Sequence, residues 1–418
     1  MQTGNRNTKE RGSLRVEVAS SVNQTPIAGA KVSISYVGEP NRVLEEVYTN
    51  SSGQTEELLL DAPPLSLSLE AGVIQPYSEY TIEVQAAGFA PEVVSGTEIL
   101  SQTAARQAVR LTPLNEENAE GNDVIVIPAH TLYGDYPPKI AEPEIKAINE
   151  SGEIVLSRVV VPETVIVHDG APSDSTAKNY YVPYRDYIKN VASSEIYATW
   201  PQATIVANVL AIMSFTLNRV YTEWYRNKGY DFTITSSTAF DHKWIYGRNI
   251  FDSISMVVDE IFDNYLSRPE VKQPILTQYC DGRRVQCPKW MTQWGSCSLG
   301  EQGYSPIEIL RYYYGDDMYI NTADVISGIP SSWPGYELTI GSSGDKVRQM
   351  QNQLRAISAV YTAIPQIMAD GIYGAETTKA VREFQSIFGL PQTGVVDFAT
   401  WYRISHIYVA ITRIAELN

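Results

Sequence analysis

Alternating hydrophobic and polar positions characterise the first quarter of the chain. The two-residue period runs through three stretches: 14–18, 32–36 and 80–84. Turn-rich pieces at 50–53 and 87–89 separate the runs. Strands with one hydrophobic face, separated by turns, predict a small antiparallel β-sandwich over residues 13–114. The polar residues 1–12 before it are expected to be a disordered tail.

The periodic pattern stops between residues 115 and 157. This stretch contains a cluster of acidic residues, Glu116, Glu117 and Glu120, and the proline-rich piece 136–138. Such a composition is typical of a solvated linker. Exposed linkers are where proteases cut, so the cleavage site of a processed precursor is expected here.

A mixed pattern follows over residues 158–333. The apolar runs 159–161 and 165–167 are typical of buried strands, whereas Tyr184, Tyr187, Ile188 and Val191 fall on one helical face. Pro201 suits the first turn of a second helix, predicted to reach about Asn227 with Gly229 as its stop. We therefore predict a central α+β domain.

Helical periodicity is clearest in residues 334–418. Apolar residues three and four apart predict one helix after Gly344 and a second that ends at Gly389. The two glycine-containing turns 370–374 and 393–397 separate the helices, and Asp397 is placed to cap a third. The prediction is a three-helix domain.

Composition narrows the classes of partner. The formal net charge is −16 and 44% of the residues are hydrophobic, which argues for packed domains and against nucleic acid or an anionic membrane as partner. The longest apolar stretch, 203–217, is too short to span a membrane, so we predict a buried helix. No signal peptide is evident at the N-terminus.

The C-terminal domain closely resembles the three-helix peptidoglycan-binding domain of many cell-wall hydrolases. Many spacings agree together, among them the glycine turns and the pairs at 384–385 (FQ) and 400–401 (TW). A generic three-helix core would not demand both turns. The resemblance implies binding without cleavage, with Asp370 and Tyr373 near the ligand groove.

The predicted sandwich and the central region also resemble known families. In the sandwich, the sequences of 26–32 (PIAGAKV) and 49–55 (TNSSGQT) resemble those of carboxypeptidase-regulatory-like and transthyretin-like domains, which are usually structural. The central region is similar to the SpoIID family of glycan-cleaving enzymes. That similarity lies in motifs in a fixed order: 181–188 (YVPYRDYI), 191–196 (VASSEI), 200–201 (WP), 217–219 (LNR), 293–296 (QWGS) and 307–313 (IEILRYY).

The SpoIID resemblance implies that Glu195 is the catalytic acid. Breaking a β-1,4 bond between N-acetylmuramic acid and N-acetylglucosamine needs a proton on the leaving oxygen. A lytic transglycosylase needs no second carboxylate, because the same Glu can deprotonate the muramic 6-hydroxyl, which attacks internally. Without the family context, a lone Glu before a tryptophan is typical of a helix-terminal surface residue.

Further substrate-binding residues follow from the same resemblance. Asp241 stands where the family has polar substrate contacts; a capping or surface Asp is the alternative. Trp200, Gln293, Trp294 and Ser296 are expected to line the sugar groove, where aromatic faces stack on sugars and Gln hydrogen-bonds the N-acetyl groups. The alternative for Trp294 is a core position beside a tight turn.

The sequence departs from the SpoIID pattern at two points. Met213 stands roughly where many members have an arginine, and residues 230–246 lack the Cys/His zinc site that many members carry. His242 with Cys280, Cys287 and Cys297 would make four ligands, but the spacing matches no recognised zinc pattern. Free buried thiols, or one disulfide with an odd cysteine, are favoured. We predict no metal and no cofactor.

The four regions together resemble the layout of clostridial spore cortex-lytic enzymes. The resemblance implies a lytic transglycosylase located at the spore cortex and coat, with cortex peptidoglycan as substrate. It also implies a precursor activated by a subtilisin-like germination protease that cuts within 115–157. Two alternatives stay open: a catalytically silent wall-binding protein that enhances a partner amidase, and a hydrolase that leaves reducing ends.

Overall fold

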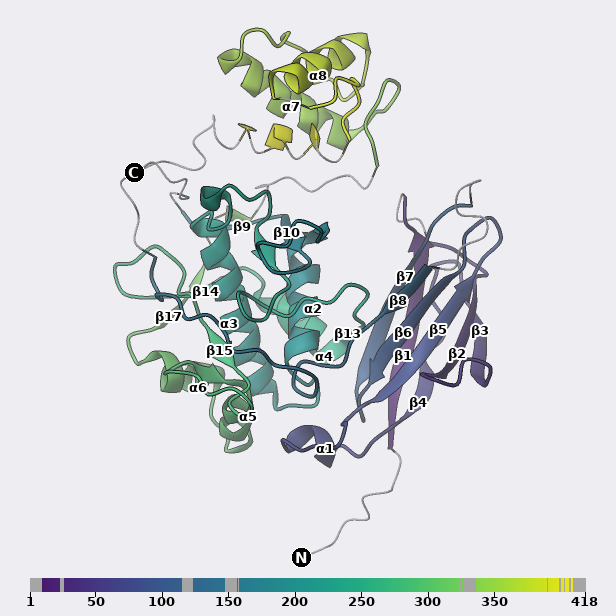
Figure 1. Cartoon of the computed structure of the whole chain (residues 1–418), viewed down its shortest axis with the longest axis vertical. Helices are drawn as coiled ribbons and strands as arrows, with labels where there is room; N and C mark the ends of the chain where they lie inside the picture. Colours follow the sequence, from purple (N-terminus) through teal and green to yellow (C-terminus); the bar gives the residue numbers. More distant parts are fainter. Residues whose placement is uncertain are drawn as a thin grey trace, which may run out of the picture.

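The computed structural model comprises a β-sandwich, a central helical region and a C-terminal helical module (Figure 1). The residues it describes are 10–22, 26–114, 123–146, 156, 158–323, 325–326, 336–388, 390–397, 400–401, 403–405 and 407–408.

Two sheets form the N-terminal sandwich. One has the order β13-β7-β1-β4, and the other has the order β3-β2-β5-β6-β8. Their bounds are β1 (Glu10–Ser20), β2 (Lys31–Tyr36), β3 (Val43–Tyr48), β4 (Leu58–Ala62), β5 (Ser78–Gln85), β6 (Glu92–Ile99), β7 (Ala104–Leu111), β8 (Asp123–Val126) and β13 (Ile250–Phe251). Leu14, Val16, Val32 and Ile82 are buried in its core, as the two-residue period predicted.

The sandwich departs from the prediction in two respects. It is mixed and not purely antiparallel, because β1 pairs with β7, and β6 with β8, in parallel. The strand β1 also begins at Glu10, inside the stretch expected to be a disordered tail; residues 1–9 lie outside the described part. Gly12 and Ser13 belong to that strand because they pair with Leu60 and Leu59 of β4.

The sandwich and the central region share one hydrophobic core. The short strand β13 comes from the central region and pairs with β7 through Ile250–Arg106 and Phe251–Ala105. Asn249 extends the joint, since its side chain donates to the main-chain oxygen of Glu98 and accepts from its N–H. The two regions therefore lie side by side as one packed unit (Figure 1).

The stretch 115–157 is only in part what the sequence predicted. Residues 123–126 form β8, and 127–146 run on along the central region with several fully buried side chains, including His130 and Thr131. A solvated linker is therefore the wrong description for 123–146. Residues 115–122, 147–155 and 157 lie outside the described part of the chain.

Helices dominate the central region. They are α2 (Tyr184–Glu195), α3 (Gln202–Tyr221), α4 (Asp252–Ile261), α5 (Gln293–Glu301) and α6 (Pro306–Tyr314). Short strands accompany them: β9 (Val160–Val161), β10 (Thr164–His168), β11 (Asn179–Pro183), β12 (Ile234–Thr235), β14 (Asn264–Ser267), β15 (Tyr279–Cys280), β16 (Met291–Thr292), β17 (Tyr319–Thr322) and β18 (Val325–Ile326). The predicted strands at 159–161 and 165–167 and the predicted helix face from Tyr184 to Val191 are confirmed.

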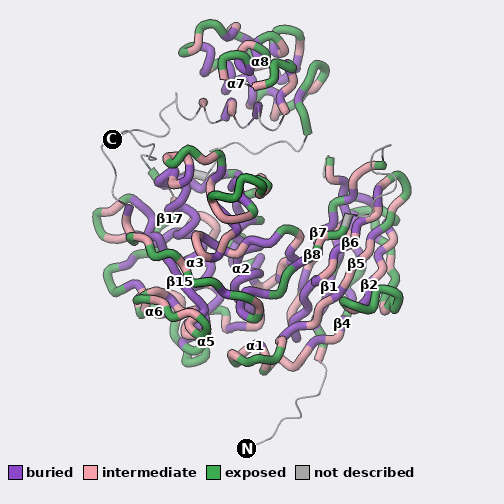
Figure 2. Tube along the Cα trace, in the orientation of Figure 1, coloured by how far each residue is buried: buried purple, intermediate pink, exposed green. Residues whose placement is uncertain are grey.

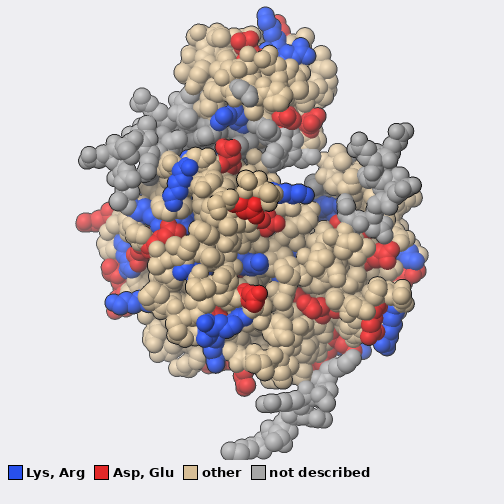
Figure 3. All heavy atoms as spheres, viewed as in Figure 1, with Lys and Arg blue, Asp and Glu red and all other residues tan. Residues whose placement is uncertain are grey.

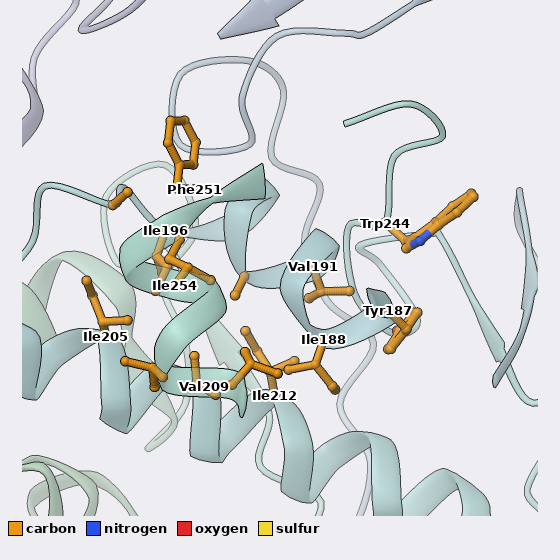
Figure 4. Close-up of a cluster of buried hydrophobic side chains, with 14 of the residues drawn as sticks. Tyr187, Ile188, Val191, Ile196, Ile205, Val209, Ile212, Trp244, Phe251 and Ile254 are labelled. Carbon is orange, nitrogen blue, oxygen red and sulfur yellow. The ribbon is translucent and has the colours of Figure 1, made fainter. Parts of the chain in front are cut away.

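The helix α3 forms the centre of this region. It is long and apolar enough to cross a membrane, yet 89% of its apolar window is buried inside the protein, as expected of a core helix. Ile205, Val209 and Ile212 of α3 face Ile188 and Val191 of α2 (Figure 4). The burial is visible along both helices in Figure 2.

The end of α3 comes earlier than predicted. The helix stops at Tyr221, and a 3-10 turn, η1 (Arg226–Lys228), leads to Gly229. Gly229 has a φ of 83°, the left-handed conformation that glycine adopts most readily, so it ends the 3-10 turn as the predicted stop.

The C-terminal module has a core of its own. Its helices α7 (Asp345–Val360) and α8 (Ala375–Ile387) enclose Met350, Leu354 and Phe384. The turn glycines Gly371 and Gly394 have φ values of 80° and 71°. Glycine is favoured at both positions because other residues rarely adopt this left-handed conformation. Asp397 accepts a hydrogen bond from the Thr400 N–H at 2.8 Å, the predicted cap of a third helix.

Candidate functional site

Glu195 is the last residue of α2 and is completely buried. Its Oε1 accepts a hydrogen bond from the Lys243 N–H at 2.8 Å, and its Oε2 accepts one from Gln293 Nε2 at 2.9 Å. Gln293 Nε2 also donates to the main-chain oxygen of Glu195 at 2.9 Å. The carboxyl is therefore held in one orientation by a loop and by the first residue of α5. The alternative of a surface position is excluded.

Three aromatic rings form a cluster just beyond Glu195. Tyr197 and Trp200 lie edge to face, with ring centroids 6.0 Å apart, and Trp294 lies 5.2 Å from Trp200. Trp200 Nε1 donates to the main-chain oxygen of Ser68 in the short helix α1 (Ser66–Leu69) of the sandwich. Trp294 is only partly buried and packs at the edge of the core; its place in a sugar groove stays a prediction.

A buried polar cluster lies beside the carboxyl. Tyr187 Oη is 3.1 Å from His242 Nδ1, and the His242 ring stacks on Tyr279. Burial lowers the pKa of His242 well below its ordinary value, with Lys139 and Arg219 adding to the effect. The imidazole is thus neutral. Burial raises the pKa of Tyr279, and the nearby Glu195 carboxylate raises it further.

Asp241 is buried and fully bonded. It accepts hydrogen bonds from Arg219 Nε at 2.7 Å, from Tyr225 Oη at 2.6 Å, and from the N–H and the hydroxyl of Thr235. Its carboxylate is a partner for the buried Arg219 guanidinium. Asp241 is therefore not a surface residue, and its role in substrate contact remains a prediction.

Ser296 is also held by protein groups. Its hydroxyl donates to the main-chain oxygen of Gln293 at 2.7 Å and accepts from Asn208 Nδ2 at 2.9 Å. Gly300 in the same helix lies so close to Thr204 that an added Cβ would meet its hydroxyl at 2.1 Å. These contacts lock α5 against α3 and thereby set the position of Gln293.

A cleft of about 510 Å³ opens beside the aromatic cluster. Tyr197, Trp294 and Arg284 line one side, and residues 67–76 of the sandwich line the other. Glu195 does not line this cleft. On the face of the molecule seen in Figure 3, acidic and basic side chains are interspersed, in keeping with a ligand that carries both charges.

The two predicted ligand-groove residues of the C-terminal module serve its turns. Asp370 accepts from Gln351 Nε2 and from the Ile372 N–H at 2.8 Å. Tyr373 is buried, and its hydroxyl donates to the main-chain oxygen of Gly394 at 2.9 Å. Tyr373 therefore ties the two glycine turns together.

The three cysteines form one disulfide and leave one free thiol, which is one of the two arrangements that the sequence favoured. Cys280 and Cys287 form a disulfide, and Cys297 is a buried free thiol. The disulfide removes two of the four groups considered for zinc. Among the described residues, no group of three or more His, Cys, Asp or Glu side chains could hold a metal ion.

Several site residues were not predicted. Lys139 and Tyr136 come from the stretch interpreted as a linker; Tyr136 is buried and Lys139 is half-buried. The charge of Glu195 influences the pKa of both. Arg219 belongs to a quoted motif but was given no role. A buried arginine at a helix end needs a carboxylate partner, which is a signal that could have linked it to Asp241.

Comparisons with known proteins relate the C-terminal part of the chain to peptidoglycan binding. Residues 343–404 match the family described as "Putative peptidoglycan binding domain". The chain is 37% identical over 73 residues to the Zinc D-Ala-D-Ala carboxypeptidase of Streptomyces albus G, which is 18% of this chain and 27% of that protein. The chain thus spans about a quarter of the length of the curated relative it matches.

Two solved structures are similar to parts of the chain. The SleB N-terminal domain is 29% identical, covering 17% of this chain and 92% of that chain at a TM-score of 0.15. The 5-hydroxyisourate hydrolase of Klebsiella pneumoniae is 15% identical, covering 24% and 86% at a TM-score of 0.17. The family match to the C-terminal domain makes this a cell-wall-related protein with a peptidoglycan-binding module.

Proposed function

We propose that this chain is a lytic transglycosylase that cleaves spore cortex peptidoglycan after proteolytic activation. The observation that carries the proposal is the Glu195 carboxyl, held by the Lys243 N–H and Gln293 Nε2 next to an aromatic cluster. A single oriented carboxyl beside aromatic rings suits a reaction that needs one proton donor and a sugar-stacking surface.

The reaction requires only this one carboxyl. Glu195 gives its proton to the glycosidic O4 as the bond from muramic C1 to O4 breaks. The muramic O6 then forms a bond to C1, and the O6 proton passes to the Glu195 carboxylate. The products are a free 4-hydroxyl and a 1,6-anhydro end, and no water is consumed. Gln293 keeps the carboxyl aimed during both transfers.

The layout supports the spore setting. A sandwich, a SpoIID-like region and a peptidoglycan-binding module in this order resemble the clostridial cortex-lytic enzyme SleC. The protein would lie at the cortex and coat as a pro-form, and a subtilisin-like germination protease would cut it. Since 123–146 is built into the fold, we place the cut in the remainder of 115–157, outside the described residues.

Mass spectrometry of digested cortex tests the activity. Processed wild-type chain should release anhydro-muramic fragments, whereas Glu195→Gln should release them more slowly by a factor of about 10² or more, because it removes the proton donor. The exposed Glu39→Gln, which makes the same charge change on the sandwich surface, should keep full activity. Equal fragment release by Glu195→Gln and wild type would contradict the assignment.

The second candidate is a catalytically silent wall-binding protein that enhances a partner amidase. It is favoured by the burial of Glu195 and by Met213, a core residue where many SpoIID relatives have arginine. Unchanged glycan with every variant, together with retained binding to sacculi, would select it. Reducing muramic ends in the same spectra would select a hydrolase.

A further inference from the structure

Residues 128–146, here named the covering segment, lie across the site around Glu195. The Thr131 N–H donates to the main-chain oxygen of Ser194, the residue before Glu195. Lys139 Nζ donates to the main-chain oxygen of Asp241 and lies 4.6 Å from the centroid of the Tyr279 ring. The covering segment thus contributes to the complete burial of Glu195 and Asp241.

The covering segment interacts electrostatically with the site. Burial lowers the pKa of Lys139, and the Glu195 and Asp241 carboxylates act in the opposite direction. Burial raises the pKa of Tyr136, and Glu195 raises it further. An ammonium group and a phenol of this segment thus sense the charge of the candidate proton donor.

The main chain of the covering segment is bound by two glutamine side chains. Gln278 accepts from the Glu142 N–H at 2.9 Å and donates to the Ile140 oxygen at 2.8 Å. Gln273 accepts from the Lys146 N–H at 2.7 Å and donates to the Lys146 oxygen at 3.2 Å. Each glutamine carboxamide thus contacts both an N–H and an oxygen of the main chain of the covering segment.

Two arginines bind the carboxylates of the same segment. Arg219 donates to both oxygens of Glu142, at 3.0 and 2.6 Å. Arg268 donates to both oxygens of Glu144, at 2.7 and 2.9 Å. Bidentate pairs of this kind are among the strongest side-chain contacts and demand a planar carboxylate. The segment 140–146 therefore presents secondary amides and carboxylates along its length.

A peptidoglycan strand presents the same groups. Its sugars carry N-acetyl amides at regular intervals, and its lactyl and peptide groups add carboxylates. We propose that the covering segment occupies the glycan-binding groove, and that Arg268, Gln273 and Gln278 bind the carboxylates and N-acetyl groups of cortex glycan once it leaves. The inference rests on the proposed function for the identity of the ligand. In this proposal, residues 128–146 cover the groove, and the sandwich itself does not.

Two engineered cuts in the full chain test the proposal. A site-specific protease sequence is placed within 115–122 and another within 147–155, chains cut at one site or at both are compared, and all fragments are kept present. Because the sandwich and the central region share one core, either single cut leaves the covering segment covalently tethered to the packed unit. A tethered segment competes at a high effective concentration. The glycan should therefore displace it readily only in the chain cut at both sites.

Amide hydrogen exchange reads the displacement without catalysis. Soluble cortex glycan should speed exchange at the Glu142 and Lys146 amides in the chain cut at both sites, in wild-type and Glu195→Gln backgrounds alike. N-deacetylated glycan is the matched control, because it lacks the amides. Faster exchange without anhydro products would support glycan binding in this groove and contradict the proposed lyase activity. Anhydro products without faster exchange, or equal displacement in singly and doubly cut chains, would contradict glycan binding in this groove.

A point variant in the chain cut at both sites gives a second measurement. Glu144→Gln weakens the pair with Arg268, so the glycan concentration that speeds exchange at the Glu142 amide should fall about tenfold, the effect of losing one charge-assisted hydrogen bond. The exposed Glu39→Gln is again the matched control. Equal glycan binding by both variants would contradict a competition between glycan and the covering segment.

Discussion

At the residue scale, the Glu195 carboxyl depends on donors from distant parts of the chain. The Lys243 N–H comes from 48 positions later and Gln293 Nε2 from 98 positions later. Gln293 can serve because Ser296 and Gly300 hold α5 tightly against α3. In the proposed reaction, Gln293 orients Glu195 through these hydrogen bonds.

The Gln293→Leu variant measures this orienting role. It keeps the approximate size of the side chain and removes the donor to Glu195, so the rate of anhydro-end formation should fall by about 10²-fold while the chain stays folded. The loss should lie in kcat and not in KM. Gln302→Leu is the control, because Gln302 is exposed and bonds only within α5. A fall in both variants would contradict a specific role for Gln293.

At the element scale, the sandwich and the central region are joined by a strand and a buried ion pair. The strand β13 completes the sheet beside β7. Next to it, Arg248 and Glu98 form an ion pair with no exposed side-chain surface. Burial raises the pKa of Glu98 from 4.5 to about 7, although Arg248 opposes the shift. The joint is therefore sensitive to pH.

The sign of this pH dependence follows from proton binding. Between pH 4.5 and about 7 the folded chain holds a proton on Glu98 that the unfolded chain has released. The stabilisation from Glu98 is thus complete below pH 4.5 and is lost as the pH rises through about 7. Glu98→Gln keeps a neutral group throughout, so the change in unfolding temperature between pH 5 and pH 8 should shrink. An unchanged difference would contradict the raised pKa.

At the scale of the whole molecule, the described chain has two main hydrophobic cores. One is shared by the sandwich and the central region, and the other belongs to the C-terminal module. An ion pair of Lys346 with Glu163, 3.4 Å long and partly exposed, links the two units. Such a pair contributes little to stability, so the module is expected to unfold independently.

Leu354→Ala tests this independence. The buried leucine of α7 fills the core of the module, and its truncation should cost about 2–5 kcal/mol of the module's stability. Calorimetry should show one transition lowered and the other unchanged, with weaker binding to sacculi. Met368→Ala, at a side chain that is 77% exposed, is the control. A shift of both transitions would show that the cores are coupled.

The sequence by itself determined the local features of this protein. The two-residue period of the sandwich, the apolar face of α2 and the two glycine turns were all predicted, because neighbouring residues specify them. The turn spacings also carried the peptidoglycan-binding assignment that the family match confirmed. Glu195 was named from its motif, and it is buried in the structure.

Only the tertiary structure decided what surrounds Glu195. Its hydrogen-bond donors come from α5 and from the loop before β13, and no local pattern brings them together. Residues 128–146 were interpreted as part of a linker over 115–157, because of the acidic residues at 116–120 and the proline-rich piece 136–138. Their partners are Gln273, Gln278 and two arginines far along the chain. Non-local hydrogen bonds of this kind satisfy the backbone groups of an extended segment, and no hydrophobic periodicity in the sequence predicts them.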